Sequence, residues 1–202
     1  QVSSLKMADR SINWIDKIKH KNAPVNNIQA SMSGGSDKTN YYMSLGRFSQ
    51  AATMGTGNFE RYTGRLDVTQ LVNSWLKLNG NISFTQSVNK NTSNPTIAAY
   101  QARPDTPEDP IFNADGTSAY YVGYQMNPAN MLLDNDNKNR MNTLLGALSA
   151  DLSLTKDLKF LSTFNTTKYN NISRNFNSPF TYSGMYQDGE YNIIGNDNFS
   201  YN

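Results

Sequence analysis

The chain has 202 residues, a formal net charge of +2 and no cysteine. The near balance of charge argues against a nucleic-acid-binding surface, and the lack of cysteine excludes a disulfide framework and a cysteine-based zinc site. Hydrophobic residues make up 37% of the chain, which is low for a soluble two-sheet core but sufficient for a membrane barrel whose strands have one face on a polar lumen.

Residues 1–24 are expected to form an extracellular loop with a short helix. Trp14 and Ile18 are four residues apart, so they would share one face of a helical turn. Ser11 is a plausible N-cap, and Pro24 would end the element.

Residues 25–33 and 40–50 predict a β-hairpin. Ile28, Ala30 and Met32 recur at every second position, and the same alternation resumes after the Gly-rich turn. Alternation of apolar and polar residues across such a turn is typical of two antiparallel strands with one apolar and one polar face.

Four more strands are predicted by the same alternation, at about residues 58–70, 75–88, 141–155 and 157–169. The even positions from Leu144 to Leu154 are all apolar or glycine. Strands of this length exceed the usual five or six residues of soluble proteins and suit a tilted membrane strand. The predicted fold is therefore all-β, an antiparallel up-and-down meander of about six long strands that forms part of a large transmembrane β-barrel.

The predicted connections alternate between short and long. Short periplasmic turns and long extracellular loops are the rule for bacterial outer-membrane barrels. The chain accordingly divides into the first four barrel strands at 25–88, a long extracellular loop at 89–140, the fifth and sixth strands at 141–169, and an extracellular loop with a β-hairpin at 170–202.

Charged residues repeat on the face opposite the apolar one, which suits a wet lumen better than a dry core. The predicted lumen-facing residues are Arg61, Arg65, Asp67, Lys77 and Asp151. Two roles are open to them: to line a transport path, or to anchor a plug domain by ion pairs.

The long loop at 89–140 carries aromatic residues beside polar ones. Aromatic rings stack on sugars and are frequent at protein interfaces, so these residues are candidates for contact with a substrate or a partner; packing of the loop on itself is the alternative. The candidates are Tyr100, Arg103, Asp105, Tyr120, Tyr121 and Tyr124.

No catalytic site, metal site or cofactor is predicted, and the chain is not expected to be an enzyme. His20 is the only histidine, so a Ser-His-Asp triad could be built around this residue alone, and an ordinary surface histidine is the expected role. The segment that begins at Asp134 starts like a calcium loop but has Lys138 at the fifth position and no glycine at the sixth.

Three phrases occur in order: SGGSDKTNYYMSLG from Ser33, NFERYTGRLDV from Asn58 and WLKLNGNISF from Trp75. They closely resemble the barrel hairpins of SusC/RagA-like TonB-dependent transporters of the Bacteroidetes outer membrane. The resemblance implies a multi-pass barrel in that membrane, in contact with its lipid and closed by a plug. We expect the chain to be an internal piece of such a protein.

The resemblance also implies that the protein imports oligosaccharides or peptides. It also implies two partners: a SusD-like surface lipoprotein, and the TonB complex through parts of the protein outside this sequence. Three other interpretations stay open: a stand-alone siderophore-type receptor, a porin or structural surface antigen, and a secreted β-sandwich that binds glycans.

Overall fold

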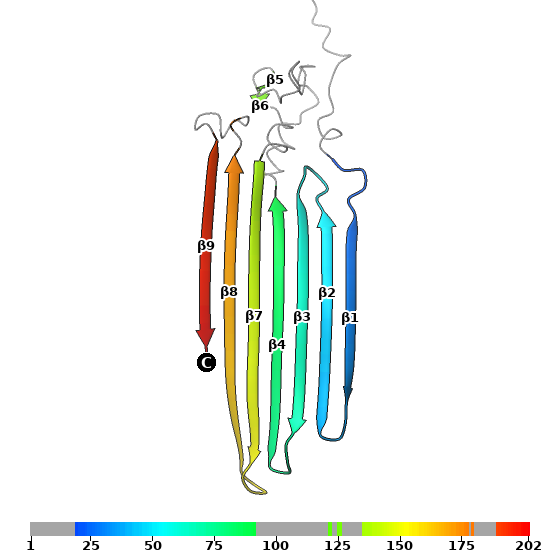
Figure 1. The fold of residues 1–202 in the computed structure, drawn as a ribbon, viewed down its shortest axis with the longest axis vertical. Helices are drawn as coiled ribbons and strands as arrows, with labels where there is room; N and C mark the ends of the chain where they lie inside the picture. Colours follow the sequence, from blue (N-terminus) through cyan, green and yellow to red (C-terminus); the bar gives the residue numbers. More distant parts are fainter. Residues whose placement is uncertain (1–18, 92–120, 123–124, 127–134, 178, 180–188) are drawn as a thin grey trace, which may run out of the picture.

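One long antiparallel sheet dominates the computed structural model, which describes residues 19–91, 121–122, 125–126, 135–177, 179 and 189–202. Neighbouring strands follow each other in the order β1-β2-β3-β4-β7-β8-β9 (Figure 1). Two short strands, β5 (Tyr121–Val122) and β6 (Gln125–Met126), pair separately. The seven long strands are β1 (Val25–Gly35), β2 (Thr39–Ala51), β3 (Asn58–Leu71), β4 (Leu76–Asn91), β7 (Asn135–Ser153), β8 (Lys159–Asn177) and β9 (Glu190–Tyr201).

The register of the strands gives the sheet two chemically different faces. Residues that are directly opposite in an antiparallel pair point to the same side. Arg65 therefore shares a face with Ser44 of β2 and Ser83 of β4, and this side is the polar face. Its opposite, the apolar face, carries mostly aliphatic and aromatic residues in the lower part of each strand, among them Ile28, Met43, Leu66, Ile82, Leu148 and Phe164.

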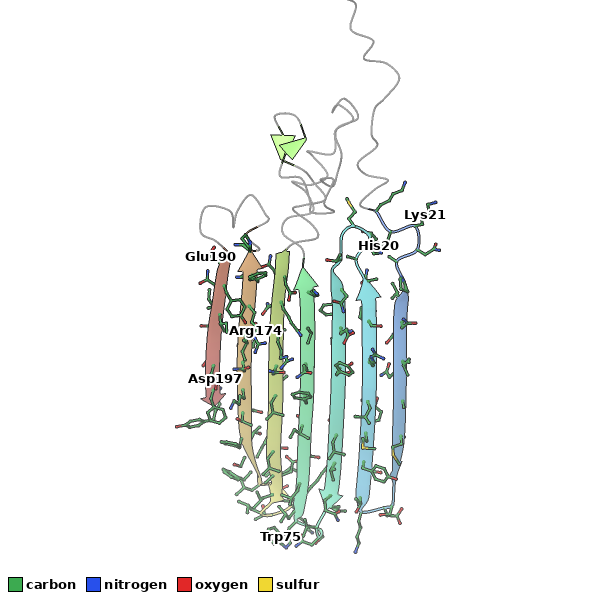
Figure 2. All side chains as sticks on the ribbon, turned by 45° about the horizontal axis from the view of Figure 1, so that its top comes forward. His20, Lys21, Trp75, Arg174, Glu190 and Asp197 are labelled. Carbon is green, nitrogen blue, oxygen red and sulfur yellow. The ribbon has the colours of Figure 1, made fainter. Side chains whose placement is uncertain are left out.

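The apolar face is open to solvent in the described residues. Leu148 is 57% exposed and Ile28 is 65% exposed, so no second layer covers them. The apolar rows run from Leu152 up to Leu144 on β7, which is about 20 Å of height for strands tilted by about 45°. Trp75 is exposed just below the band, at the end of the short turns (Figure 2). The outward apolar band of outer-membrane barrels is about 25 Å tall, so the height of this belt is close to that of such a band.

The three short turns share one hydrogen-bond pattern. In each, a polar side chain at the start of the turn accepts hydrogen bonds from backbone N–H groups two and three residues on, a local geometry that favours chain reversal. Asn73 Oδ1 accepts from Trp75 at 3.0 Å and from Leu76 at 2.8 Å. Ser36 and Thr155 use their hydroxyl oxygens in the same way.

The long connections lie at the other end of the sheet, as predicted. They comprise residues 52–57, 92–134 and 178–189, whereas the short turns comprise 36–38, 72–75 and 154–158 (Figure 1). The predicted all-β meander is confirmed.

The strand count and some strand boundaries differ from the prediction. The sheet has seven long strands and not about six, because residues 190–201, expected within an extracellular loop, form β9 against β8. β7 begins at Asn135 and β8 ends at Asn177, so both enter segments that were predicted to be loops. These segments are rich in asparagine, which is common in turns, but here their backbone continues the ladder.

Residues 1–18, where a short helix was predicted, lie outside the described residues. In the part of the chain that the structure describes, no helix has the length and apolar character to cross a membrane.

The two faces predict opposite responses to the same substitution. Leu148→Lys places a charge in the middle of the apolar band, and we expect the free energy of unfolding of the full-length protein in lipid vesicles to fall by about 2–4 kcal/mol. Thr163→Lys, on the exposed polar face of the neighbouring strand, should change it little. Urea titration measures both values, and equal effects of the two substitutions would contradict the assignment of the faces.

Candidate functional site: the polar face of the sheet

The polar face brings together all the residues that were predicted to face a lumen. Arg61, Arg65 and Asp67 lie on β3, and Lys77 and Asp151 occupy paired positions on β4 and β7. The register places the five on one side of the sheet. The structure thus agrees with a common face; that this face lines a lumen is a prediction about the complete protein.

Arg65 and Asp67 form a pair within β3. Arg65 Nε donates to Asp67 Oδ2 at 2.6 Å, and Arg65 Nη2 donates to Asp67 Oδ1 at 3.0 Å. Two parallel bonds hold the planar guanidinium against the carboxylate in a fixed orientation. Because both side chains are two residues apart on one strand, they neutralise each other without help from another strand.

A hydrogen-bond network connects three strands near the short-turn end of the polar face. Thr69 Oγ1 donates to Asn79 Oδ1 at 3.1 Å, and Asn79 Nδ2 lies 3.2 Å from both Ser149 Oγ and Asp151 Oδ2. Asn79 is the common member, and it joins β3, β4 and β7. The network holds the Asp151 side chain against the polar face of the sheet.

The row below this network mixes apolar and charged side chains. Leu71, Lys77, Asp151 and Leu161 are paired in succession across β3, β4, β7 and β8. Leu161 is 65% exposed, and Lys77 forms no ion pair with any residue that the structure describes. We call these four residues the lower row. The lower row therefore presents exposed apolar groups and an unpaired cation side by side.

A second cluster lies near the long connections and was not predicted. Arg61 stands over the ring of Phe48 at 5.6 Å from its centroid, and the Phe48 and Phe59 rings are 6.0 Å apart. The alternation of β2 and β3 contains the signal for it, since Phe59 and Arg61 share a face; the pairing of Phe48 with Arg61 needs the register. The cluster thus combines a cation–π contact with two rings tilted by 58° to each other, which gives it both a charge and an apolar surface.

Two buried amide oxygens on the same face, Asn137 Oδ1 and Asn171 Oδ1, have no hydrogen-bond partner among the described residues. Buried acceptors normally have a donor. These atoms lie on β7 and β8, in the halves of the strands nearest the long connections.

The aromatic loop candidates are nearly all beyond the described residues. Tyr121 begins β5, and its backbone is described. The other five, whose proposed contacts therefore stay predictions, are Tyr100, Arg103, Asp105, Tyr120 and Tyr124. Within the ranges described, no group of three or more His, Cys, Asp or Glu side chains is arranged to hold a metal ion.

No protein-family model matches the chain. Two curated proteins of Formosa agariphila are similar to it in sequence: "TonB-dependent receptor P26", 28% identical over 173 residues and 82% of this chain, and "TonB-dependent receptor P3", 27% identical over 190 residues and 88% of this chain. Both are receptors by name and not enzymes, in agreement with the prediction from sequence.

Two solved structures share the fold. The RagAB peptide transporter matches 95% of the chain with a TM-score of 0.73, and the RagAB peptide importer in its "closed-closed" state matches 96% with a TM-score of 0.74, each at 21% identity. The chain spans 17% and 19% of the length of the curated relatives and 22% and 23% of the solved chains. Together, the matches confirm the predicted resemblance to SusC/RagA-like TonB-dependent receptors.

The network around Asn79 predicts a local stability effect. Asn79→Ala removes the shared partner of Thr69, Ser149 and Asp151, and we expect the free energy of unfolding of the full-length protein to fall by about 1–2 kcal/mol. Asn81→Ala is the matched control, because Asn81 is exposed on the same strand and face and forms no side-chain hydrogen bond within the described ranges. Urea titration in detergent micelles compares them; a control as destabilised as Asn79→Ala would refute the role of the network.

Proposed function

We propose, from the confirmed resemblance to SusC/RagA-like TonB-dependent receptors, that this chain is a wall segment of an outer-membrane importer that works with a SusD-like surface lipoprotein. The observation that carries the proposal is the two-faced sheet. Its exposed apolar band suits lipid, and its polar face suits a lumen. Short turns on one side and long connections on the other fit a barrel in the bacterial outer membrane.

The cargo we propose is an oligosaccharide or a peptide. The solved structures with this fold are of a peptide transporter, which favours a peptide. The cluster of Phe48, Phe59 and Arg61 is compatible with both classes, since rings stack on sugars and a guanidinium pairs with peptide carboxylates. The loop residues around Tyr100 and Tyr121 would complete a surface that contacts cargo or lipoprotein.

For the lower row we favour the role of plug anchor over that of transport path. A path for water-soluble cargo has little use for Leu161, which is 65% exposed, whereas a folded plug domain would cover it. Lys77, which has no ionic partner among the described residues, would then pair with a carboxylate of the plug. The Arg65–Asp67 pair is already satisfied and is better suited to lining the lumen.

A stand-alone receptor or porin is the second candidate, because the wall of such a protein has the same two faces. It differs in having no lipoprotein partner.

Co-purification separates the two candidates. We would insert an affinity tag between Gly116 and Thr117 of the full-length protein and purify it from outer membranes in mild detergent. We expect a stoichiometric SusD-like lipoprotein in the mass spectrum of the eluate. The barrel alone would favour the stand-alone receptor or porin, and recovery in the soluble fraction would overturn the membrane assignment.

Conductance in planar bilayers tests the plug anchor. Lys77→Ala should loosen the plug, so the full-length protein should show more frequent open-channel events than the wild type. Lys156→Ala is the control, because this exposed lysine lies in the turn at 154–158. If Lys77→Ala lowers cargo uptake with no change in conductance, the residue lines the path instead.

A further inference from the structure

Above the apolar band, the apolar face of β4, β7, β8 and β9 changes character. A polar collar of Gln86, Asn142 and Asn170 marks the boundary. Gln86 Nε2 donates to Asn142 Oδ1 at 2.8 Å, and Asn142 Nδ2 donates to Asn170 Oδ1 at 3.3 Å. The row below this collar contains Phe84 and Leu144, and the rows above it contain cations.

Three of these cations lie side by side. Lys90 of β4 is directly opposite Lys138 of β7, which is directly opposite Arg174 of β8. Arg140 is two residues from Lys138 on β7 and therefore on the same face. We call Lys90, Lys138, Arg140 and Arg174 the cation row. Like charges directly opposite each other destabilise a sheet, so such a row calls for an anion.

The carboxylates on this face neutralise only Lys90 of the cation row. Asp136 pairs with Lys90 at 3.3 Å, and Asp197 lies 3.9 Å from Lys168, one row below the collar. Among the described residues, Lys138, Arg140 and Arg174 form no ion pair. By contrast, Arg47 on β2 has both Glu60 at 3.9 Å and the ring of Tyr62 at 5.7 Å. The excess positive charge is thus local to β7 and β8.

The unpaired cations also shape a hollow. Lys138, Arg140 and Arg174 surround a shallow depression together with Ile172. Arg140 and Arg174 are both exposed, and Arg174 is labelled in the upper half of β8 in Figure 2. A depression lined by three cations and one aliphatic side chain suits a ligand with an anionic head and an apolar part.

The height of the cation row agrees with that of lipid headgroups. Arg140 and Lys138 are four and six residues above Leu144, the last apolar residue of β7, or about 10 and 15 Å higher for a strand tilted by about 45°. Long cationic side chains can bend toward the apolar boundary. The row is at the end of the long connections, which corresponds to the outer leaflet.

We propose that the cation row binds the phosphate groups of anionic lipids in the outer leaflet. The inference rests on the proposed membrane location and adds a specific site on the lipid-facing side of the wall, distinct from the lumen. The apolar band below would hold the acyl chains, while Lys138, Arg140 and Arg174 take the headgroup phosphate through charge-assisted hydrogen bonds.

Native mass spectrometry of the full-length protein in detergent tests this site. The probes are phosphatidylglycerol, which carries one phosphate charge, zwitterionic phosphatidylcholine and inorganic phosphate. We expect the wild type to retain phosphatidylglycerol over phosphatidylcholine, and Arg140→Gln/Arg174→Gln to reduce this preference about tenfold or more. Lys38→Gln/Lys156→Gln is the matched control: it also removes two exposed cations, at the short-turn end, and should keep the preference.

Several outcomes would overturn the proposal. These are no preference in the wild type, the same preference in Arg140→Gln/Arg174→Gln as in the wild type, or an equal loss in the control. Displacement by inorganic phosphate at the lipid's own concentration would show a site for the free ion. Loss of a co-purifying acidic protein with unchanged lipid binding would assign the cation row to that protein. Fractionation is scored separately, so a protein that is found in the outer membrane without lipid preference refutes only this inference.

Discussion

The structure depends on one constraint: the backbone N–H and C=O groups of each strand must pair with those of the neighbouring strands. In hydrocarbon, each unpaired group costs several kcal/mol, so a membrane wall must be a helix or a closed sheet. Between neighbouring strands, the described chain satisfies this with ladders such as Leu76 to Asn91 against β7, while the outer edges of β1 and β9 have no strand partner in the described sheet. Once this register is fixed, each side chain is assigned to one of two faces, and a shift of one residue would exchange the apolar and the polar face.

The alternation of apolar and polar residues made the half of the sheet nearest the short turns predictable from sequence. In β4 and β7, apolar residues at every second position reveal both the strand and its face, as from Leu144 to Leu152. The upper half carries polar residues on both faces, so the alternation of apolar and polar residues disappears at Asn135 to Asn139 although the ladder continues. The start of β7 was therefore predicted too late, at about 141, and the end of β8 too early, at about 169. β9 was missed although Tyr191 and Ile193 alternate with polar residues, because the surrounding asparagines favoured a loop.

The same limit applies to the site. Sequence places Arg61, Arg65 and Asp67 on one face, because parity within a strand is enough for that. Partners across strands need the register, which no single strand contains. Three contacts depend on the register in this way. They are the contact of Arg61 with the Phe48 ring, the hydrogen bonds by which Asn79 links three strands, and the row of three cations across β4, β7 and β8. The aromatic candidates of the long loop lie outside the described residues and stay predictions.

The ladder between β4 and β7 has a consequence for how such proteins diverge. Residues 92–134, which connect β4 to β7, form the longest connection between paired strands. The ladder that holds the two strands together runs from Leu76 to Asn91 of β4. Because closure entropy rises only with the logarithm of loop length, a doubled loop adds about 0.6 kcal/mol, far less than a ladder of this length supplies. Insertions, deletions and exchanges in this segment are therefore nearly neutral for folding. This segment can therefore diverge in sequence and length while the sheet stays unchanged.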